Sequence, residues 1–305
     1  MTTLLSYESF VDASNAELCA RLASFVETRR EICVPIWTQY YAFDVIGAIT
    51  VGESFGYMRH ETDPTKVLQS VHDSMAYGSV VGLFPALHPW LAWAARTAKQ
   101  RIPFDNILDF LNAQQDKRKT HPDSGSANDF LSKLLLLREK GKLTSHDVTT
   151  TLGANVAAGS DTTAISLSSV IYHLMHSPSS QAKLVAEIDT LASQNKISNP
   201  VKFREAQEMP YLQAVIKEAL RMHPATGQML SRVVPPEGAL LAGFWFPGGS
   251  VVGCNPWVTH LDTTVFGADA AQFNPDRWLG KPEKVAEMER NMFTVRDLSP
   301  SSFLA

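Results

Sequence analysis

Two short stretches of the sequence bring together side chains that could do chemistry. In AGSDTT, residues 158–163, the carboxyl of Asp161 adjoins the hydroxyl of Thr162, and a hydroxyl beside a carboxylate can transfer protons where the geometry allows it. In KEALRMHP, residues 217–224, Glu218 and Arg221 are three residues apart and therefore face the same side of a helix. Taken alone, the first stretch is better explained by a kinked or closely packed core helix, and the second by a surface ion pair worth under about 1 kcal/mol.

Cysteine and histidine are the residue types that would indicate a metal site or a disulfide framework, and their spacing favours neither. The three cysteines, Cys19, Cys33 and Cys254, are odd in number and far apart, which favours a reducing compartment. His173 and His176 form a His-x-x-His pair at the end of an apolar run. At that place we expect packing and helix capping rather than metal binding.

Charge and hydropathy exclude further classes of partner. The net charge of -4 argues against nucleic acid. The first residues, MTTLLSYESF, have neither the basic flank nor the apolar run of a signal peptide, and no stretch approaches the roughly 18 apolar residues of a membrane-spanning helix. We therefore expect no membrane anchor in this chain. The absence of a Gly-x-Ser-x-Gly motif argues against a hydrolase.

The elements that carry the two stretches are predicted to be helices. Thr144 and Asp147 form a capping-box pattern, and no proline interrupts the sequence from there to residue 176. This predicts a helix over about 144–176, roughly 45 Å long at about 1.5 Å per residue. A second helix, about 210–222, begins with proline. Short β-branched and aromatic runs broken by Pro and Gly predict a small β region over about 225–255. The expected fold class is mainly α with a minor β region (α+β).

A third motif makes a family resemblance specific. FNPDRW, residues 273–278, follows the predicted strands. The three motifs in this order resemble the oxygen-activating helix, the Glu-x-x-Arg helix and the Phe-x-Pro-x-Arg-Trp loop of cytochrome P-450, a haem-thiolate monooxygenase. The text between the motifs resembles the fungal pisatin-demethylase-like group, and the resemblance runs from about Gln39 to Phe293. It implies one incomplete cytochrome P-450 domain over residues 1–305.

The resemblance also implies structural roles. Arg277 is expected to join Glu218 and Arg221 in one buried network that holds the loop leading toward the haem. Removing one partner from such a network should cost about 3–5 kcal/mol. Arg232 matches the arginine that pairs with a haem propionate. The planar guanidinium group of arginine suits a carboxylate of this kind. A solvated arginine at a strand edge is the alternative for Arg232.

The catalytic roles implied by the resemblance fall on the first stretch. Asp161 and Thr162 are expected to deliver protons during oxygen activation, next to the cofactor contacts of Ala158 and Gly159. The cofactor is heme, the substrate is a small apolar molecule, and electrons come from an NADPH-dependent reductase. The implied function is monooxygenation, which in this group belongs to fungal secondary-metabolite biosynthesis.

The sequence departs from the family where the iron ligand is expected. The family loop reads Phe-x-x-Gly-x-Arg-x-Cys-x-Gly, and its cysteine binds the iron. Its four diagnostic positions here carry Val295, Leu298, Pro300 and Ser302, so no residue is assigned as a metal ligand. We expect a chain truncated at both ends and inactive as given. The alternative is a non-catalytic remnant that acts as a binding scaffold. Family members usually reside in the endoplasmic-reticulum membrane, whereas this chain, without an anchor, would be cytoplasmic.

Overall fold

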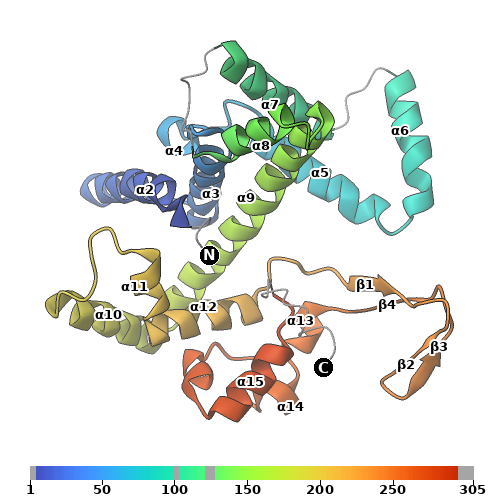
Figure 1. The fold of residues 1–305 in the computed structure, drawn as a ribbon. Coiled ribbons are helices and arrows are strands. Elements are labelled where there is room, and N and C mark those ends of the chain that lie inside the picture. The colour runs from blue at the N-terminus through green and yellow to red at the C-terminus, as the bar shows by residue number, and fades with distance from the viewer. Residues whose placement is uncertain (1–4, 99–102, 121–127, 295–305) are drawn as a thin grey trace. The chain divides into compact units, whose positions relative to one another are not determined.

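The computed structural model describes residues 5–98, 103–120 and 128–294 (Figure 1). The chain divides into two compact units, Met1–Ala164 and Ile165–Ala305, and each is described by itself. That all 305 residues form one domain stays a prediction. The four positions compared with the iron-binding loop, 295 to 302, lie outside the described residues.

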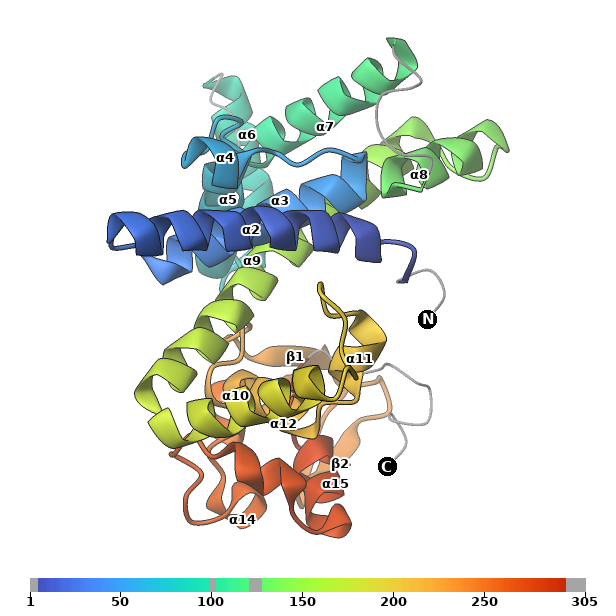
Figure 2. The ribbon, with the colours of Figure 1, turned by 90° about the vertical axis from the view of Figure 1, so that its left-hand side faces the viewer.

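The first unit is helical. Its elements are α2 (Glu8–Thr28), α3 (Val34–Val51), α4 (Tyr57–His60), α5 (Val67–Val81), η1 (Pro85–Leu87), α6 (His88–Thr97), α7 (Pro103–Thr120), α8 (Phe130–Glu139) and the first part of α9 (Ser145–His176). Helix α3 contacts α2, α4 and α8, and α5 packs along α7. Figure 2 shows α2 lying across α3.

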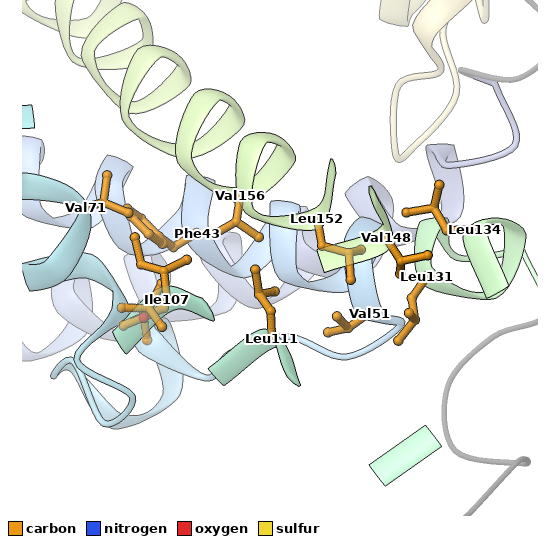
Figure 3. Close-up of a cluster of buried hydrophobic side chains, with 12 residues drawn as sticks. Phe43, Val51, Val71, Ile107, Leu111, Leu131, Leu134, Val148, Leu152 and Val156 are labelled. Carbon is orange, nitrogen blue, oxygen red and sulfur yellow. The ribbon is translucent and has the colours of Figure 1, made fainter. Parts of the chain in front are cut away.

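The core of the first unit lies where five helices meet (Figure 3). Each contributes a fully buried apolar side chain, namely Phe43 of α3, Val71 of α5, Ile107 of α7, Leu131 of α8 and Leu152 of α9. A fully buried side chain of this size stabilises a fold by about 1.5–3 kcal/mol relative to its exposure. This core therefore fixes the first turns of α9 against α3, α7 and α8.

The start of α9 confirms the predicted capping box. The Asp147 carboxylate accepts hydrogen bonds from the backbone N–H and the hydroxyl of Thr144, and the Thr144 hydroxyl accepts one from the backbone N–H of Asp147 at 3.1 Å. These bonds satisfy donors that the first turn of a helix leaves without a partner. The helix then continues unbroken to His176, so residues 158–163 lie within regular α-helix.

The second unit combines helices with two small hairpins. After the last turns of α9 come α10 (Pro178–Ser193), α11 (Phe203–Gln207), α12 (Pro210–Met222), β1 (Leu230–Val233), β2 (Ala239–Leu241), β3 (Phe244–Phe246), β4 (Val251–Cys254), α13 (Pro256–Thr259), α14 (Thr263–Phe266), η2 (Pro275–Leu279) and α15 (Pro282–Arg290). Strand β1 pairs antiparallel with β4, and β2 with β3. The β2–β3 turn places Ala242 and Gly243 at φ 48° and 83°, the left-handed pair that suits a two-residue hairpin.

Helix α12 is the centre of the second unit, and its predicted bounds are confirmed. One of its faces joins the cluster of Ala214, Phe266, Ala270, Trp278 and Met288. The mainly helical fold with a minor β region is therefore as predicted. Within the ranges the structure describes, no helix is both long and apolar enough to cross a membrane.

Candidate functional site

A fully buried carboxylate on α12 organises the second unit. Oε1 of Glu218 accepts hydrogen bonds from Nη2 of Arg221 at 2.7 Å, from Nε of Arg277 at 3.0 Å and from the backbone N–H of Asn274 at 2.9 Å. Oε2 accepts from Nε of Arg221 at 2.8 Å and from the indole N–H of Trp278 at 2.9 Å. The structure thus brings together Glu218, Arg221 and Arg277, the three residues grouped from the sequence. A buried charge needs partners of this kind, because an unpaired one is very costly.

The two guanidinium groups also hold the segment between α13 and η2, which includes α14. Arg221 donates to the backbone carbonyls of His260, at 2.7 Å, and of Ala270, at 2.6 Å. Arg277 donates to the backbone carbonyl of Phe266. Both arginines reach the carbonyl of Gln272, at 3.1 and 3.3 Å. The side chains of Arg221 and Arg277 are 0% and 6% exposed, and the bonds to His260 and Ala270 are buried, so these two are worth more than surface contacts.

Asp269 adds a second carboxylate at the rim of the network. Its Oδ1 and Oδ2 each lie 3.1 Å from Arg277, at Nη1 and Nη2. The Asn274 side-chain amide, first, and then Arg277 hold the pKa of Asp269 below its ordinary value. Asp269 and Arg277 thus form a bidentate ion pair, which fixes the orientation of the guanidinium plane.

Sequence reasoning assigned no role to several partners in this network. Trp278 adjoins Arg277 in the FNPDRW motif, so the motif itself was a signal for it. Asn274 enters through its backbone, and the 1%-exposed His260 has no local pattern that marks it. Helix α10 supplies Glu187, whose carboxylate accepts hydrogen bonds from the backbone N–H groups of Tyr211 and Leu212 at the start of α12.

The first unit holds Asp161 in a small polar cluster on α9. The side-chain amide of Gln39, on α3, donates to Oδ1 of Asp161 at 2.9 Å. Nε2 of His72, on α5, lies 3.5 Å from the same oxygen and 2.5 Å from Nε2 of Gln39. The Asp161 side chain is 16% exposed and that of His72 is 44% exposed. The cluster therefore connects a mostly buried carboxylate to a histidine that reaches solvent. Neither Gln39 nor His72 carried a signal in the sequence.

The neighbours of Asp161 show how tightly α9 packs. The Thr162 hydroxyl donates to the carbonyl of Ala158 at 2.7 Å, the local bond that hydroxyl residues form within helices. A Cβ added at Gly159 would lie 2.8 Å from Cδ1 of Ile46, on α3. Close packing of α9 on α3 thus accounts for this glycine, the alternative that composition alone favoured. Cofactor contacts by Ala158 and Gly159 stay predictions.

The other residues singled out from the sequence lie apart from the network. Arg232 is exposed on β1, and its Nη1 donates to the carbonyl of Ser231 at 2.8 Å. Its propionate role stays a prediction. His176 contacts the carbonyl of Tyr172 through Nδ1, at 2.8 Å. His173 stacks on Phe273, with ring centroids 4.7 Å apart, and burial lowers its pKa. Packing and capping therefore account for the His-x-x-His pair.

The residues present do not fit the iron of a haem held by a thiolate. Cys19, Cys33 and Cys254 are exposed, and all three precede the FNPDRW motif. In the part of the chain that the structure describes, no three His, Cys, Asp or Glu side chains are grouped so that they could hold a metal ion. We therefore assign no iron ligand and derive no chemical step through the iron.

Comparison with known proteins places these features in context. The cytochrome P-450 family model matches residues 1–293. A pisatin demethylase of Fusarium vanettenii is 38% identical over 286 residues, which cover 92% of this chain and 56% of that protein. A cytochrome P-450 monooxygenase of Emericella nidulans is 34% identical over 304 residues and is covered to 60%. A crystal structure of a cytochrome P-450 superposes with a TM-score of 0.72 at 22% identity, over 93% of this chain and 60% of that one. The chain thus spans little more than half the length of these relatives.

Proposed function

The chain belongs to the cytochrome P-450 family, and we propose that the whole protein is a haem-dependent monooxygenase that oxidises a small apolar molecule in fungal secondary metabolism. The similar pisatin demethylase and the Emericella monooxygenase support this reaction class. An NADPH-dependent reductase is the electron donor that we propose for the whole protein. Family membership makes haem the expected cofactor.

The observation that carries the proposal is the cluster around Asp161. Its carboxylate adjoins Thr162 in the middle of α9 and is held by Gln39 at 2.9 Å. The His72 imidazole, which reaches solvent, lies 3.5 Å from Oδ1 of Asp161 and so offers a short path for protons from water to that carboxylate. A carboxyl supplied in this way can act as a general acid, a contribution of about 10²–10⁴-fold in rate.

The network in the second unit supports the same proposal from the structural side. Glu218, Arg221 and Arg277 fix the backbone from His260 to Gln272. In the proposed enzyme this network carries the loop toward the cofactor, and Arg232 binds a propionate. The cofactor contacts of Ala158 and Gly159 complete the proposed set.

For the 305 residues alone we propose no oxygenase activity, because none of their cysteines supplies the thiolate. A purified chain mixed with haem should therefore lack the carbon monoxide spectrum typical of thiolate-bound iron. Stoichiometric haem with that spectrum would contradict this part of the proposal. A non-catalytic chain that binds a partner through its helical scaffold is the second candidate, and the absence of that spectrum would be compatible with it.

The proposed reaction can be tested in a chimera in which residues 1–293 replace the matching segment of the Fusarium pisatin demethylase. The relative then supplies what precedes and follows. With haem and reductase, Asp161→Asn and Thr162→Ala should lower the product formed per NADPH consumed. Thr163→Ala, the same change one residue along α9 at another exposed position, is the matched control. Equal product yields from Thr162→Ala and Thr163→Ala in a haem-loaded chimera would refute the proposed proton delivery.

A further inference from the structure

A buried histidine outside the three motifs joins two distant parts of the second unit. His260 follows α13 and is 1% exposed. Its Nδ1 lies 3.0 Å from the carbonyl oxygen of Arg221, at the end of α12. The backbone N–H of Phe293, beyond α15, donates to its Nε2 at 2.9 Å. The rings of Phe266 and Phe293 lie 6.2 and 6.4 Å from the imidazole.

These two partners fix the protonation state of the ring. A carbonyl oxygen can only accept a hydrogen bond, so Nδ1 must carry a hydrogen. A backbone N–H can only donate, so Nε2 must have its lone pair free. Only the neutral Nδ1–H tautomer meets both requirements. In the imidazolium form, the N–H groups of Nε2 and Phe293 would face each other, and that hydrogen bond would be lost.

We propose that His260 is a positioning residue, which in its neutral Nδ1–H form attaches the chain at Phe293 to the end of α12. The anchor is rigid, because Arg221 is itself held by Glu218. His260 thereby fixes where Phe293 lies relative to the end of α12.

The surroundings of the ring favour its neutral form. Helix α12 brings the cation Arg221 with Glu218 paired to it, and η2 brings Arg277, also paired to Glu218. Helix α14 and the segment after α15 bring the uncharged Phe266 and Phe293. Burial, first, lowers the pKa of His260, and the charge of Arg221 lowers it further, whereas the carbonyl of Arg221 raises it.

The sign of the pH dependence follows from that lowered pKa. Because the folded state favours neutral imidazole, the attachment is complete above the ordinary histidine pKa of about 6.5. It is lost as the pH falls through the lower pKa of the folded state. Acid should therefore release Phe293 from His260.

The first test reads the tautomer directly in the unaltered full chain. A long-range ¹H–¹⁵N spectrum at neutral pH should show the Nδ1 of His260 protonated and Nε2 unprotonated. The opposite tautomer, or a charged ring, would overturn the proposal. This measurement needs no haem, so its failure is distinct from a failure of the proposed oxygenase function.

The second test separates the two nitrogens by substitution. In His260→Asn the amide N–H can take the place of Nδ1, but nothing accepts from Phe293. In His260→Gln the amide oxygen reaches the place of Nε2. Hydrogen exchange at the Phe293 amide should be about tenfold faster in the Asn variant. In the Gln variant it should be close to that of the unaltered chain, and its protection relative to the intrinsic rate should no longer fall as the pH is lowered.

His223→Asn is the matched control, because His223 is an exposed histidine at the end of α12, close in sequence to the Arg221 carbonyl that His260 contacts. It should leave exchange at Phe293 unchanged. Slow exchange at Phe293 in His260→Asn, or equally fast exchange in His260→Gln, would overturn the proposed use of Nε2.

Discussion

Replacing Glu218 by Gln keeps the shape of the side chain and removes its charge, which makes it the sharpest perturbation of the buried network. Oε2 accepts from Arg221 and Trp278, whereas Oε1 accepts from Arg221, Arg277 and the backbone N–H of Asn274. Whichever oxygen becomes the amide nitrogen, at least two bonds are lost: the two of Oε2 or the three of Oε1. At least two donors then face an N–H group in a fully buried site.

The expected cost follows from those lost bonds. A hydrogen bond to a charged group contributes about 1.5–3 kcal/mol, and breaking a buried ion pair costs about 3–5 kcal/mol. We therefore expect Glu218→Gln to destabilise the second unit by about 4 kcal/mol. A change of that size corresponds to roughly 10 °C in melting temperature for a unit of this size.

Hydrogen exchange in α12 and η2, together with thermal unfolding followed by tryptophan fluorescence, measures this cost. Glu289→Gln is the matched control, because Glu289 also pairs with α12, through Lys217 at 2.5 Å, but is 38% exposed. It should cost less than about 1 kcal/mol. Arg277→Ala combined with Glu218→Gln should be less than additive, since both act on one network. Equal effects of Glu218→Gln and Glu289→Gln would refute the reasoning.

Two further predictions concern the packing of α9 and the acid sensitivity of the network. Gly159→Ala should destabilise the first unit by about 1 kcal/mol, because the added Cβ would lie 2.8 Å from Ile46. Gly153→Ala should instead stabilise it by up to about 1 kcal/mol, because the nearest contact of its Cβ is at 3.4 Å. Denaturant titrations measure both, and restored stability in Gly159→Ala with Ile46→Val would confirm the clash. Because the pKa of Asp269 is lowered, its contribution is complete above its ordinary pKa of about 3.9 and is lost as the pH falls through the folded-state pKa. Asp269→Asn should thus weaken the dependence of the free energy of unfolding of the second unit on pH in the acid range. An unchanged dependence would show that the ion pair of Asp269 with Arg277 does not stabilise this unit.

Local signals predicted elements well because their causes lie within a few residues. The start of α9 depends on Thr144 and Asp147, and α12 begins at Pro210 and ends before His223-Pro224. Side chains far apart in sequence could not be paired in this way. Arg277 lies 59 residues from Glu218, and only the family resemblance grouped them.

The cluster around Asp161 shows what neither local signals nor resemblance could provide. Gln39 lies 122 residues from Asp161, and an amide on an apolar helix has no pattern that identifies its partner. His260 is similar, because it bonds only to backbone groups, which every residue possesses. Such contacts depend on how helices are placed in space, and that placement is decided by the packing of many side chains together.

The guanidinium groups of Arg221 and Arg277 bind the segment before η2 mostly through its backbone, so most of these bonds do not depend on its side chains. Their acceptors at His260, Phe266, Ala270 and Gln272 are backbone carbonyls, which any amino acid supplies. The curve of this loop can therefore be kept while an exposed side chain on it is exchanged. Gln272 is such a position, since it is exposed and contributes its carbonyl oxygen to both arginines. A spectroscopic label attached there would report on the state of the buried network from the surface, without removing any of its hydrogen bonds.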